Sequence, residues 1–322
     1  GVAVLKEDGS VVTWGPDVWG GNSQAVLDQI NSGVIDIVSH NWSFAALKDN
    51  GSVVTWGNSS YGGDSSSVSS DLQSGVQTVF SNYLGFAALK TGGKVVSWGN
   101  ISGFAGVAAQ LQSGVVHVYT NHSSFAALKD DGSVVTWGDN QRGGDSSDLD
   151  LSSGVVKVFS TNRSFAALKD DGSVLTWGLE SFGGDNYGGN SSSVSSGLQS
   201  GVVNIFSNYY AYAALKSNGS VITWADTSKG GDSSDLDLSS GVVKIIPSIN
   251  AFAALKTDGS VVTWGSYGGG DSSSVSSDLS SGVKEIFSSD YAFAALKEDG
   301  SVITWGNGDP ADSSSVSSDL QS

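Results

Sequence analysis

Residues Phe44–Gly57 have the sequence FAALKDNGSVVTWG, which predicts two short strands joined by a tight turn. Phenylalanine, valine, threonine and tryptophan favour strands, and the Asn-Gly pair supplies the positive φ that a two-residue hairpin turn requires. In the first strand Phe44 and Ala46 alternate with Ala45 and Leu47, so both faces are apolar. A strand that is apolar on both faces lies between two other layers.

The same hairpin recurs along the chain at an interval of about 41 residues, which is the signature of a repeat fold. Its tryptophan stands at Trp14, Trp56, Trp98, Trp137, Trp177, Trp224, Trp264 and Trp305. The hairpins are predicted at residues 2–15, 44–57, 86–99, 125–138, 165–178, 212–225, 252–265 and 293–306. The longest interval, 47 residues between Trp177 and Trp224, contains an insertion that duplicates a Gly-Gly unit.

A Ser-Gly-Val string follows each of the first seven hairpins and predicts a third strand. The Ser-rich segment between a hairpin and this string predicts a short helical turn or a loose outer strand. A unit of three or four short strands that repeats radially is a propeller blade. A β-solenoid is the rival interpretation, but it would have shorter coils and no hairpin turn.

We therefore expect an all-β chain, a single β-propeller domain over residues 1–322 with about eight short blades, one of them incomplete. The incomplete blade is inferred because eight hairpins accompany only seven Ser-Gly-Val strings, and Leu320-Gln321-Ser322 stands where an eighth would begin. Two alternatives are seven blades plus a spare hairpin, or a segment of a longer array completed by other residues or another subunit.

The composition excludes several classes of protein. Serine (62 residues) and glycine (44) make up about a third of the chain, but 39% of it is apolar and 10 residues are Trp, which excludes a disordered polar tract. A net charge of −17 removes the attraction for phosphate on which nucleic-acid binding depends. The chain has no Cys for disulfides, thiol catalysis or Cys-ligated zinc. No apolar run approaches the ~18 residues of a membrane span, so we expect no membrane insertion.

The repeats resemble the regulator-of-chromosome-condensation superfamily, and within it the compact bacterial branch whose propeller inhibits class A β-lactamases. The motifs that carry the resemblance are Ser153-Gly154-Val155, Ala167-Leu168-Lys169, Asp171-Gly172 and Thr176-Trp177-Gly178, and they recur in nearly every unit. The resemblance implies a propeller fold and allows a role as a β-lactamase-type enzyme inhibitor. This chain differs from the branch in two ways: Val68, Val194 or Val275 stands where the branch usually has proline, and eight hairpins replace seven units.

Catalytic residues are not expected. The three histidines, His40, His117 and His122, form no metal-binding or catalytic spacing, and no nucleophile elbow is present. We predict no catalytic site and no cofactor. Calcium is a minor alternative, because oxygen ligands at short spacing suit that ion, although turn acids that cap the backbone explain the same pattern. The weak candidates are Asp145, Asp148, Asp150, Asp232, Asp235 and Asp237.

Two loops of each repeat vary in sequence while the frame stays constant. One joins the third strand to the next hairpin and has the same length in all seven copies, and the other follows Trp-Gly. In an up-and-down blade both loops emerge at the same end, and their aromatic and arginine residues are the types enriched in binding hot spots. The predicted binding face consists of Trp19, Trp42, Tyr61, Tyr83, Phe104, His122, Arg142, Arg163, Phe182, Tyr209, Tyr210, Lys229, Tyr267 and Tyr291.

These features predict a non-enzymatic bacterial propeller, extracellular or on the cell surface, that binds a protein or a surface glycan through this aromatic loop face. One alternative is the enzyme inhibitor implied by the resemblance. Another is a structural or assembly module of a large bacterial surface or matrix protein, with self-association through the incomplete blade. An acidic, serine-rich surface without Cys suits such an environment.

Overall fold

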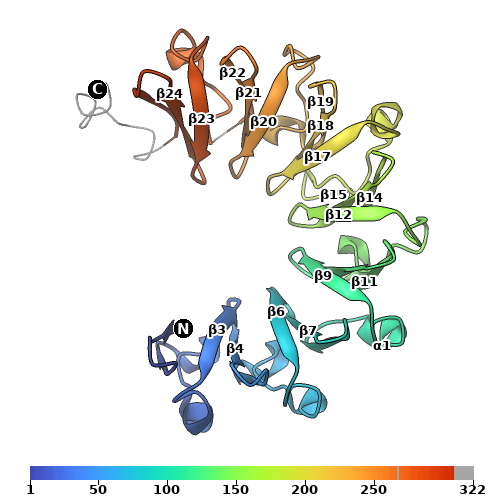
Figure 1. Cartoon of the computed structure of the whole chain (residues 1–322), viewed down its shortest axis with the longest axis vertical. Helices are drawn as coiled ribbons and strands as arrows, with labels where there is room; N and C mark the ends of the chain where they lie inside the picture. Colours follow the sequence, from blue (N-terminus) through green and yellow to red (C-terminus); the bar gives the residue numbers. More distant parts are fainter. Residues whose placement is uncertain (267, 308–322) are drawn as a thin grey trace. The chain divides into compact units, whose positions relative to one another are not determined.

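A computed structural model describes residues 1–266 and 268–307, and this part of the chain is all-β apart from short helical turns. The strands form one two-stranded and seven three-stranded antiparallel blades, plus one small additional hairpin (Figure 1). The predicted multi-blade β-propeller architecture is confirmed at the level of the blades. Leu320-Gln321-Ser322, on which the notion of a missing eighth strand rests, lies outside the described residues.

The blades follow one another in chain order and are numbered accordingly. Blade 1 consists of β1 (Val2–Leu5) and β2 (Val11–Trp14), blade 2 of β3 (Val34–Ser39), β4 (Ser43–Lys48) and β5 (Val53–Gly57), blade 3 of β6 (Val76–Asn82), β7 (Gly85–Lys90) and β8 (Val95–Gly99), and blade 4 of β9 (Val115–Thr120), β10 (Ser124–Lys129) and β11 (Val134–Gly138). Blade 5 consists of β12 (Val155–Ser160), β13 (Ser164–Lys169) and β14 (Val174–Gly178), blade 6 of β17 (Val202–Ser207), β18 (Ala211–Lys216) and β19 (Val221–Ala225), blade 7 of β20 (Val242–Pro247), β21 (Ala251–Lys256) and β22 (Val261–Gly265), and blade 8 of β23 (Val283–Ser288), β24 (Ala292–Lys297) and β25 (Val302–Gly306).

The register is the same from blade to blade, as the repeated sequence requires. In blade 2 Phe44 lies opposite Trp56, and Leu47 lies opposite Val53. The third strand pairs with the other edge of the central strand and carries a bulge after Val34. The Ser-rich segments before it form 3-10 turns in several blades, which agrees with the predicted helical turn. These turns are η2 (Gln24–Gln29), η4 (Ser66–Val68), η6 (Ser192–Leu198) and η8 (Ser273–Val275).

Contacts divide the chain into two compact units, Gly1–Val155 and Val156–Ser322. Unit 1 contains blades 1–4, and unit 2 contains blades 5–8 apart from the first residue of β12. The single domain over residues 1–322 stays a prediction.

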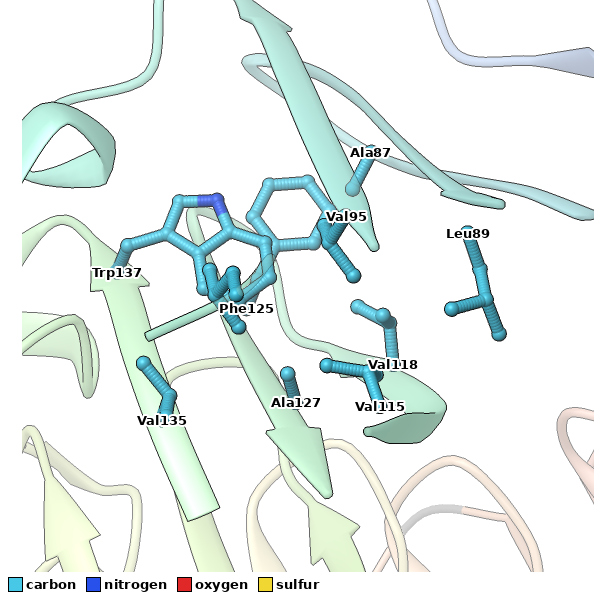
Figure 2. Packing of buried hydrophobic residues seen from close by; sticks show 10 residues of the cluster. Ala87, Leu89, Val95, Val115, Val118, Phe125, Ala127, Val135 and Trp137 are labelled. Carbon is cyan, nitrogen blue, oxygen red and sulfur yellow. The ribbon is translucent and has the colours of Figure 1, made fainter. Parts of the chain in front are cut away.

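Burial of the central strand on both faces, predicted from its sequence, is confirmed. Phe44 and Ala46 pack with Trp56 against blade 1, whereas Ala45 and Leu47 pack against blade 3. The alanines are fully buried, so the absence of a larger side chain lets neighbouring sheets approach closely. Figure 2 shows the equivalent layer between blades 3 and 4, in which the Phe125 and Trp137 rings stack at 5.1 Å beside Val118.

In most blades the Gly-Gly loop that follows the tryptophan strand covers the aromatic pair of the next blade. Trp98 Nε1 donates a hydrogen bond to the Gly62 carbonyl oxygen at 3.0 Å, and Trp56 makes the same contact with Gly20. A Cβ atom on Gly62 would lie 2.7 Å from the Phe86 ring, and its φ of 93° is one that other residues rarely adopt. These glycines are therefore required by the backbone conformation of the loop and by its packing against the next blade.

Candidate binding face

The two variable loops of a blade lie at the same end of its sheet, as predicted from the order of connections; we call them the rim loops. In blade 2 the Asn58 amide donates to the Trp42 carbonyl oxygen at 3.0 Å, and in blade 5 Leu179 makes the same contact with Arg163. The hairpin turns lie at the other end, where the Gly51 carbonyl oxygen accepts from the Val76 amide at 2.9 Å.

A buried polar side chain at the start of the first rim loop holds the two loops together. Asn121 accepts from the Ser123 and Ser124 amides at 3.0 and 2.8 Å and donates through Nδ2 to the Arg142 carbonyl oxygen at 2.5 Å. Asn208 makes the equivalent set of contacts in blade 6, including 2.8 Å to the Lys229 carbonyl oxygen. These residues were not among the predicted site residues, although Asn recurs at this repeat position in blades 3, 4 and 6.

His40 has the holding role in blade 2. Its Nε2 lies 2.9 Å from the Tyr61 carbonyl oxygen, and its Nδ1 accepts from the Trp42 amide at 3.4 Å. This arrangement uses the neutral imidazole, with one nitrogen donating and the other accepting. Burial lowers the pKa of His40 below its ordinary value, in spite of the opposing effect of the hydrogen bond to Tyr61. His40 thus stabilises the rim and is not placed for proton transfer.

Four rings in unit 1 form a contiguous group, which we call the aromatic stack. Trp42 stacks on Tyr61 at 5.5 Å between ring centroids, and Tyr83 meets the edges of both at 6.1 and 6.2 Å. Tyr83 then stacks on His122 at 4.6 Å. These residues come from three successive blades and are all half-buried, so they combine fixed positions with accessible ring surface.

Arg142 continues the aromatic stack on its polar side. Its Nη1 donates to Ser123 Oγ at 3.0 Å, and the same oxygen lies 2.7 Å from His122 Nδ1. Arg142 also forms an ion pair with Asp139 at 3.5 Å. The predicted residues Trp42, Tyr61, Tyr83, His122 and Arg142 are therefore brought together.

Trp19 and Phe104 are placed differently from the rest of the predicted face. Trp19 is 46% exposed and lines, with His40 and Trp42, an open hollow of about 630 Å³. Phe104 begins the short helix α1 (Phe104–Val107), and its ring packs against Trp137 at 5.7 Å within the core of blades 3 and 4. Phe104 thus covers Trp137 where the preceding loop lacks a Gly-Gly pair, and its place in a binding face stays a prediction.

The insertion after blade 5 builds a second group in unit 2. It forms a two-stranded hairpin of β15 (Ser181–Phe182) and β16 (Asp185–Asn186). The guanidinium carbon of Arg163 lies 4.6 Å from the centroid of the Phe182 ring and 4.9 Å from that of Tyr187. Tyr187 is buried and had not been predicted, because a residue inside an insertion has no counterpart in other repeats.

Lys229 completes this group, which we call the cation cluster. Its Nζ lies 3.6 Å from the centroid of the Tyr210 ring and 2.5 Å from Asp185. Burial opposes the charge of Lys229, but the hydrogen bond to Asp185 and the charge of Asp226 outweigh it and raise the pKa of the ammonium group. Tyr210 also contacts Tyr187 and Tyr209, at 5.4 and 4.7 Å.

The remaining predicted residue of the face that the structure describes, Tyr291, belongs to neither group. Tyr291 is 50% exposed in the rim loop of blade 8, whereas Tyr267 lies outside the described residues. His117 does not belong to the rim: it lies on β9 beside Phe80 and Tyr119, and burial lowers its pKa.

Four of the six aspartates proposed as weak calcium ligands accept hydrogen bonds within their own turns. Asp145 accepts from the Ser147 amide at 2.9 Å, Asp150 from Ser152, Asp232 from Ser234 and Asp237 from Ser239. These hydrogen bonds lower the pKa of Asp145, Asp232 and Asp237. Within residues 1–266 and 268–307, three or more His, Asp or Glu side chains do not gather as a metal site would require. No helix in the same residues is long and apolar enough to cross a membrane.

Comparison with known proteins returns solved structures only. No protein-family model and no curated protein matches the chain. The structure is similar to Prp20p from Saccharomyces cerevisiae, with 15% identity over 91% of this chain and 80% of that chain and a TM-score of 0.43. It is also similar to the ectodomains of two receptor kinases: CR4 from Physcomitrella patens (15% identity, 83% of this chain, 70% of that chain, TM-score 0.42) and ACR4 from Arabidopsis thaliana (17%, 84%, 94%, TM-score 0.37).

The structure of Prp20p is described with its binding to Gsp1p and histones, and Prp20p is the yeast RCC1 protein. The likeness to these structures is one of fold, and membership of the regulator-of-chromosome-condensation superfamily stays a prediction. Membership of the compact bacterial branch stays a prediction.

Proposed function

We propose that this chain is a non-enzymatic binding module that engages a protein partner through its rim loops. The observation that carries the proposal is the aromatic stack, a continuous group of Trp, Tyr and His rings that are half-exposed and supplied by three blades. Large aromatic side chains held by a rigid frame are the usual anchors of protein interfaces.

The way in which the loops are held supports binding over catalysis. The buried polar side chains at the start of the first rim loop hydrogen-bond to backbone carbonyl groups of the second rim loop; these side chains are Asn121, Asn208 and His40. A rim that is already ordered loses little conformational entropy when a partner binds. The rim loops thus present fixed contact residues, and their buried polar groups serve to hold these residues in place.

The proposed setting is extracellular or on the surface of a bacterial cell. The support is compositional: the chain carries a net charge of −17, has no Cys and is rich in serine. A surface glycan is the other class of ligand for the same face, because sugar rings stack on aromatic side chains.

The rim hypothesis is tested with the double variant Trp42→Ala/Tyr83→Ala. Partners captured from a bacterial surface extract by the parent chain should be lost or weakened at least tenfold in the variant. The control, Lys169→Ala/Asp170→Ala, alters the hairpin-turn end of blade 5 and should capture as the parent does. Equal capture by both variants would contradict the proposal. Binding only to a glycan array would replace the protein partner by a glycan, and binding to a purified class A β-lactamase would favour the inhibitor alternative.

A second candidate function, assembly with another copy, is favoured by the face of blade 1 that no blade of unit 1 covers. Trp14 and Val12 are 51% and 50% exposed, whereas their equivalents in blade 2, Trp56 and Val54, are 4% and 8% exposed against a neighbouring blade. Because this face has the repeat positions that blades bury against one another, we propose that a blade of a second copy occupies it.

Light scattering over a wide concentration range tests the assembly function. The parent chain should associate as its concentration rises, and Val12→Ser/Trp14→Ser should remain monomeric. The control Phe182→Ser removes an exposed ring elsewhere and should associate like the parent. A parent chain that stays monomeric throughout would contradict the assembly function and leave the rim hypothesis untouched.

A further inference from the structure

Unsatisfied polar atoms gather at one position of the repeat. Among the described residues, three buried side-chain atoms have no hydrogen-bond partner: Trp42 Nε1, Arg163 Nη1 and Asn250 Oδ1. All three residues occupy the same repeat position. Each lies four residues after the last apolar residue of the third strand and two before the first aromatic residue of the hairpin. A buried polar atom without a partner costs about 1–3 kcal/mol, so its repetition at one rim position indicates groups that a ligand satisfies.

Arg163 is the most developed of these three positions. Phe182 and Tyr187 contact its guanidinium group through their rings, at 4.6 and 4.9 Å from the ring centroids. Its Nε donates to Asn162 Oδ1 at 3.3 Å, which further fixes the plane of the group. The guanidinium is thus held in place while Nη1 is left without an acceptor.

The other arginine of the chain shows what a satisfied guanidinium looks like here. The sequence contains only Arg142 and Arg163, and both lie in rim loops. Arg142 pairs with Asp139 at 3.5 Å and donates to Ser123 Oγ. Arg163 has no carboxylate within ion-pair distance among residues 1–266 and 268–307, and the nearby Asp185 pairs with Lys229 instead.

We propose that Arg163 binds the carboxylate of an aspartate or glutamate side chain of the protein partner. This inference rests on the proposed function and names the chemistry that one part of the rim recognises. A guanidinium fork matches the two oxygens of a carboxylate, and flanking rings exclude water and strengthen that contact. In the described residues, Lys229 of the cation cluster forms ion pairs with carboxylates of its own chain, whereas the Arg163 guanidinium group forms none.

The hairpin that carries Phe182 provides a way in for the carboxylate. Phe182 is 58% exposed, and the adjacent Gly183 and Gly184 have open space where a side chain would stand. In the proposed complex the exposed Phe182 ring turns away from the guanidinium group and a carboxylate oxygen reaches Nη1. Tyr187 is buried and keeps the other side of the guanidinium in place.

The experiment uses the fact that the chain has two arginines. Protein labelled with ¹⁵N-arginine gives two side-chain Nε signals, which Arg163→Lys and Arg142→Lys assign. Titration with N-acetylglutamate at constant ionic strength should shift the Arg163 signal saturably, with a half-maximum in the millimolar range, and should leave the Arg142 signal within its line width. N-acetylglutamine, which has the same shape without the charge, is the matched control.

Several outcomes would overturn the inference. These are equal shifts of both arginines, equal shifts with N-acetylglutamine, no shift of Arg163, or a saturable shift with inorganic phosphate alone. The result is separate from the test of the rim: loss of partner capture in Trp42→Ala/Tyr83→Ala together with a silent Arg163 would remove the carboxylate site and leave the binding function standing. Once a partner is isolated, Arg163→Gln should weaken its binding at least tenfold, and Arg142→Gln should have the smaller effect.

Discussion

The aromatic stack of unit 1 and the cation cluster of unit 2 occupy equivalent rim loops but are held together differently. Trp42, Tyr61, Tyr83 and His122 contact one another ring to ring. In unit 2 two cations, Arg163 and Lys229, lie over aromatic rings. A constant backbone frame can therefore carry two kinds of contact surface, one apolar and one charged, when only the loop side chains differ.

The largest expected difference between the two regions is the loss of stability when a cation is removed from each. Lys229 is 19% exposed and lies close to Asp226, which is only 8% exposed, so Lys229→Gln leaves a buried carboxylate without its cation. We expect a loss of about 2–3 kcal/mol in the free energy of unfolding. Arg142→Gln removes a cation from a more exposed pair and should cost less than about 1 kcal/mol. Urea unfolding followed by tryptophan fluorescence measures both, and equal losses would refute the distinction.

The aromatic stack should be weaker to break and insensitive to salt. Tyr83→Leu removes ring contacts with Trp42, Tyr61 and His122, for which we expect a loss of about 1.5 kcal/mol. Because ring stacking is not screened by ions, this loss should be the same at low salt and in 1 M NaCl, whereas the cost of Lys229→Gln should shrink in high salt. Urea unfolding of both variants at the two salt concentrations measures this difference. A salt-dependent loss for Tyr83→Leu would count against a purely aromatic contact.

A smaller effect is expected beneath the cation cluster, at Tyr212. This residue replaces the phenylalanine of the other complete blades, and its hydroxyl accepts from the Thr161 amide at 3.0 Å and contacts Ser164 Oγ at 2.9 Å. Burial raises the pKa of Tyr212 to about 12. Tyr212→Phe should lower the free energy of unfolding by about 1 kcal/mol, because the Thr161 amide keeps a second acceptor in Ser164. Tyr83→Phe is the control and should change it by less than about 0.5 kcal/mol.

The smallest effect should distinguish the two units by pH. All three histidines lie in unit 1, and burial lowers the pKa of His40 and His117 below the unfolded value of 6.5. The unfolded chain therefore binds more protons below pH 6.5, so this contribution to stability is present above pH 6.5 and is lost as the pH falls below it. Hydrogen exchange is measured at pH 7 and pH 5 and corrected for intrinsic rates. Protection around Tyr61 and Trp42 should be weaker at pH 5 than at pH 7, and protection in blades 6 and 7 should be the same at both. His40→Gln should reduce the difference, and equal losses in both units would contradict the assignment.

Much of the fold could be predicted from residues Phe44–Gly57 and their repeats. The positions of the strands, the two apolar faces and the shared end of the rim loops follow from side-chain alternation and turn chemistry, which act over a few residues. The grouping of Trp42, Tyr61 and Tyr83 could be anticipated for the same reason, because equivalent loops of successive blades are neighbours. The packing of Phe104 over Trp137, where other blades have a Gly-Gly loop, could not be predicted from the repeats, because it depends on a loop of a different sequence.

The blade, its length and the end at which variable residues gather could thus be predicted from the sequence, because hairpins form from contacts between residues close in the chain. Only the folded chain showed that the insertion places Tyr187 and Phe182 beside Arg163, and that Asn121 and Asn208 clamp the loops. Such contacts join residues about 20 positions apart through side-chain geometry that no period in the sequence encodes. For that reason the rim could be located from the repeats, whereas its unsatisfied arginine became visible only in three dimensions.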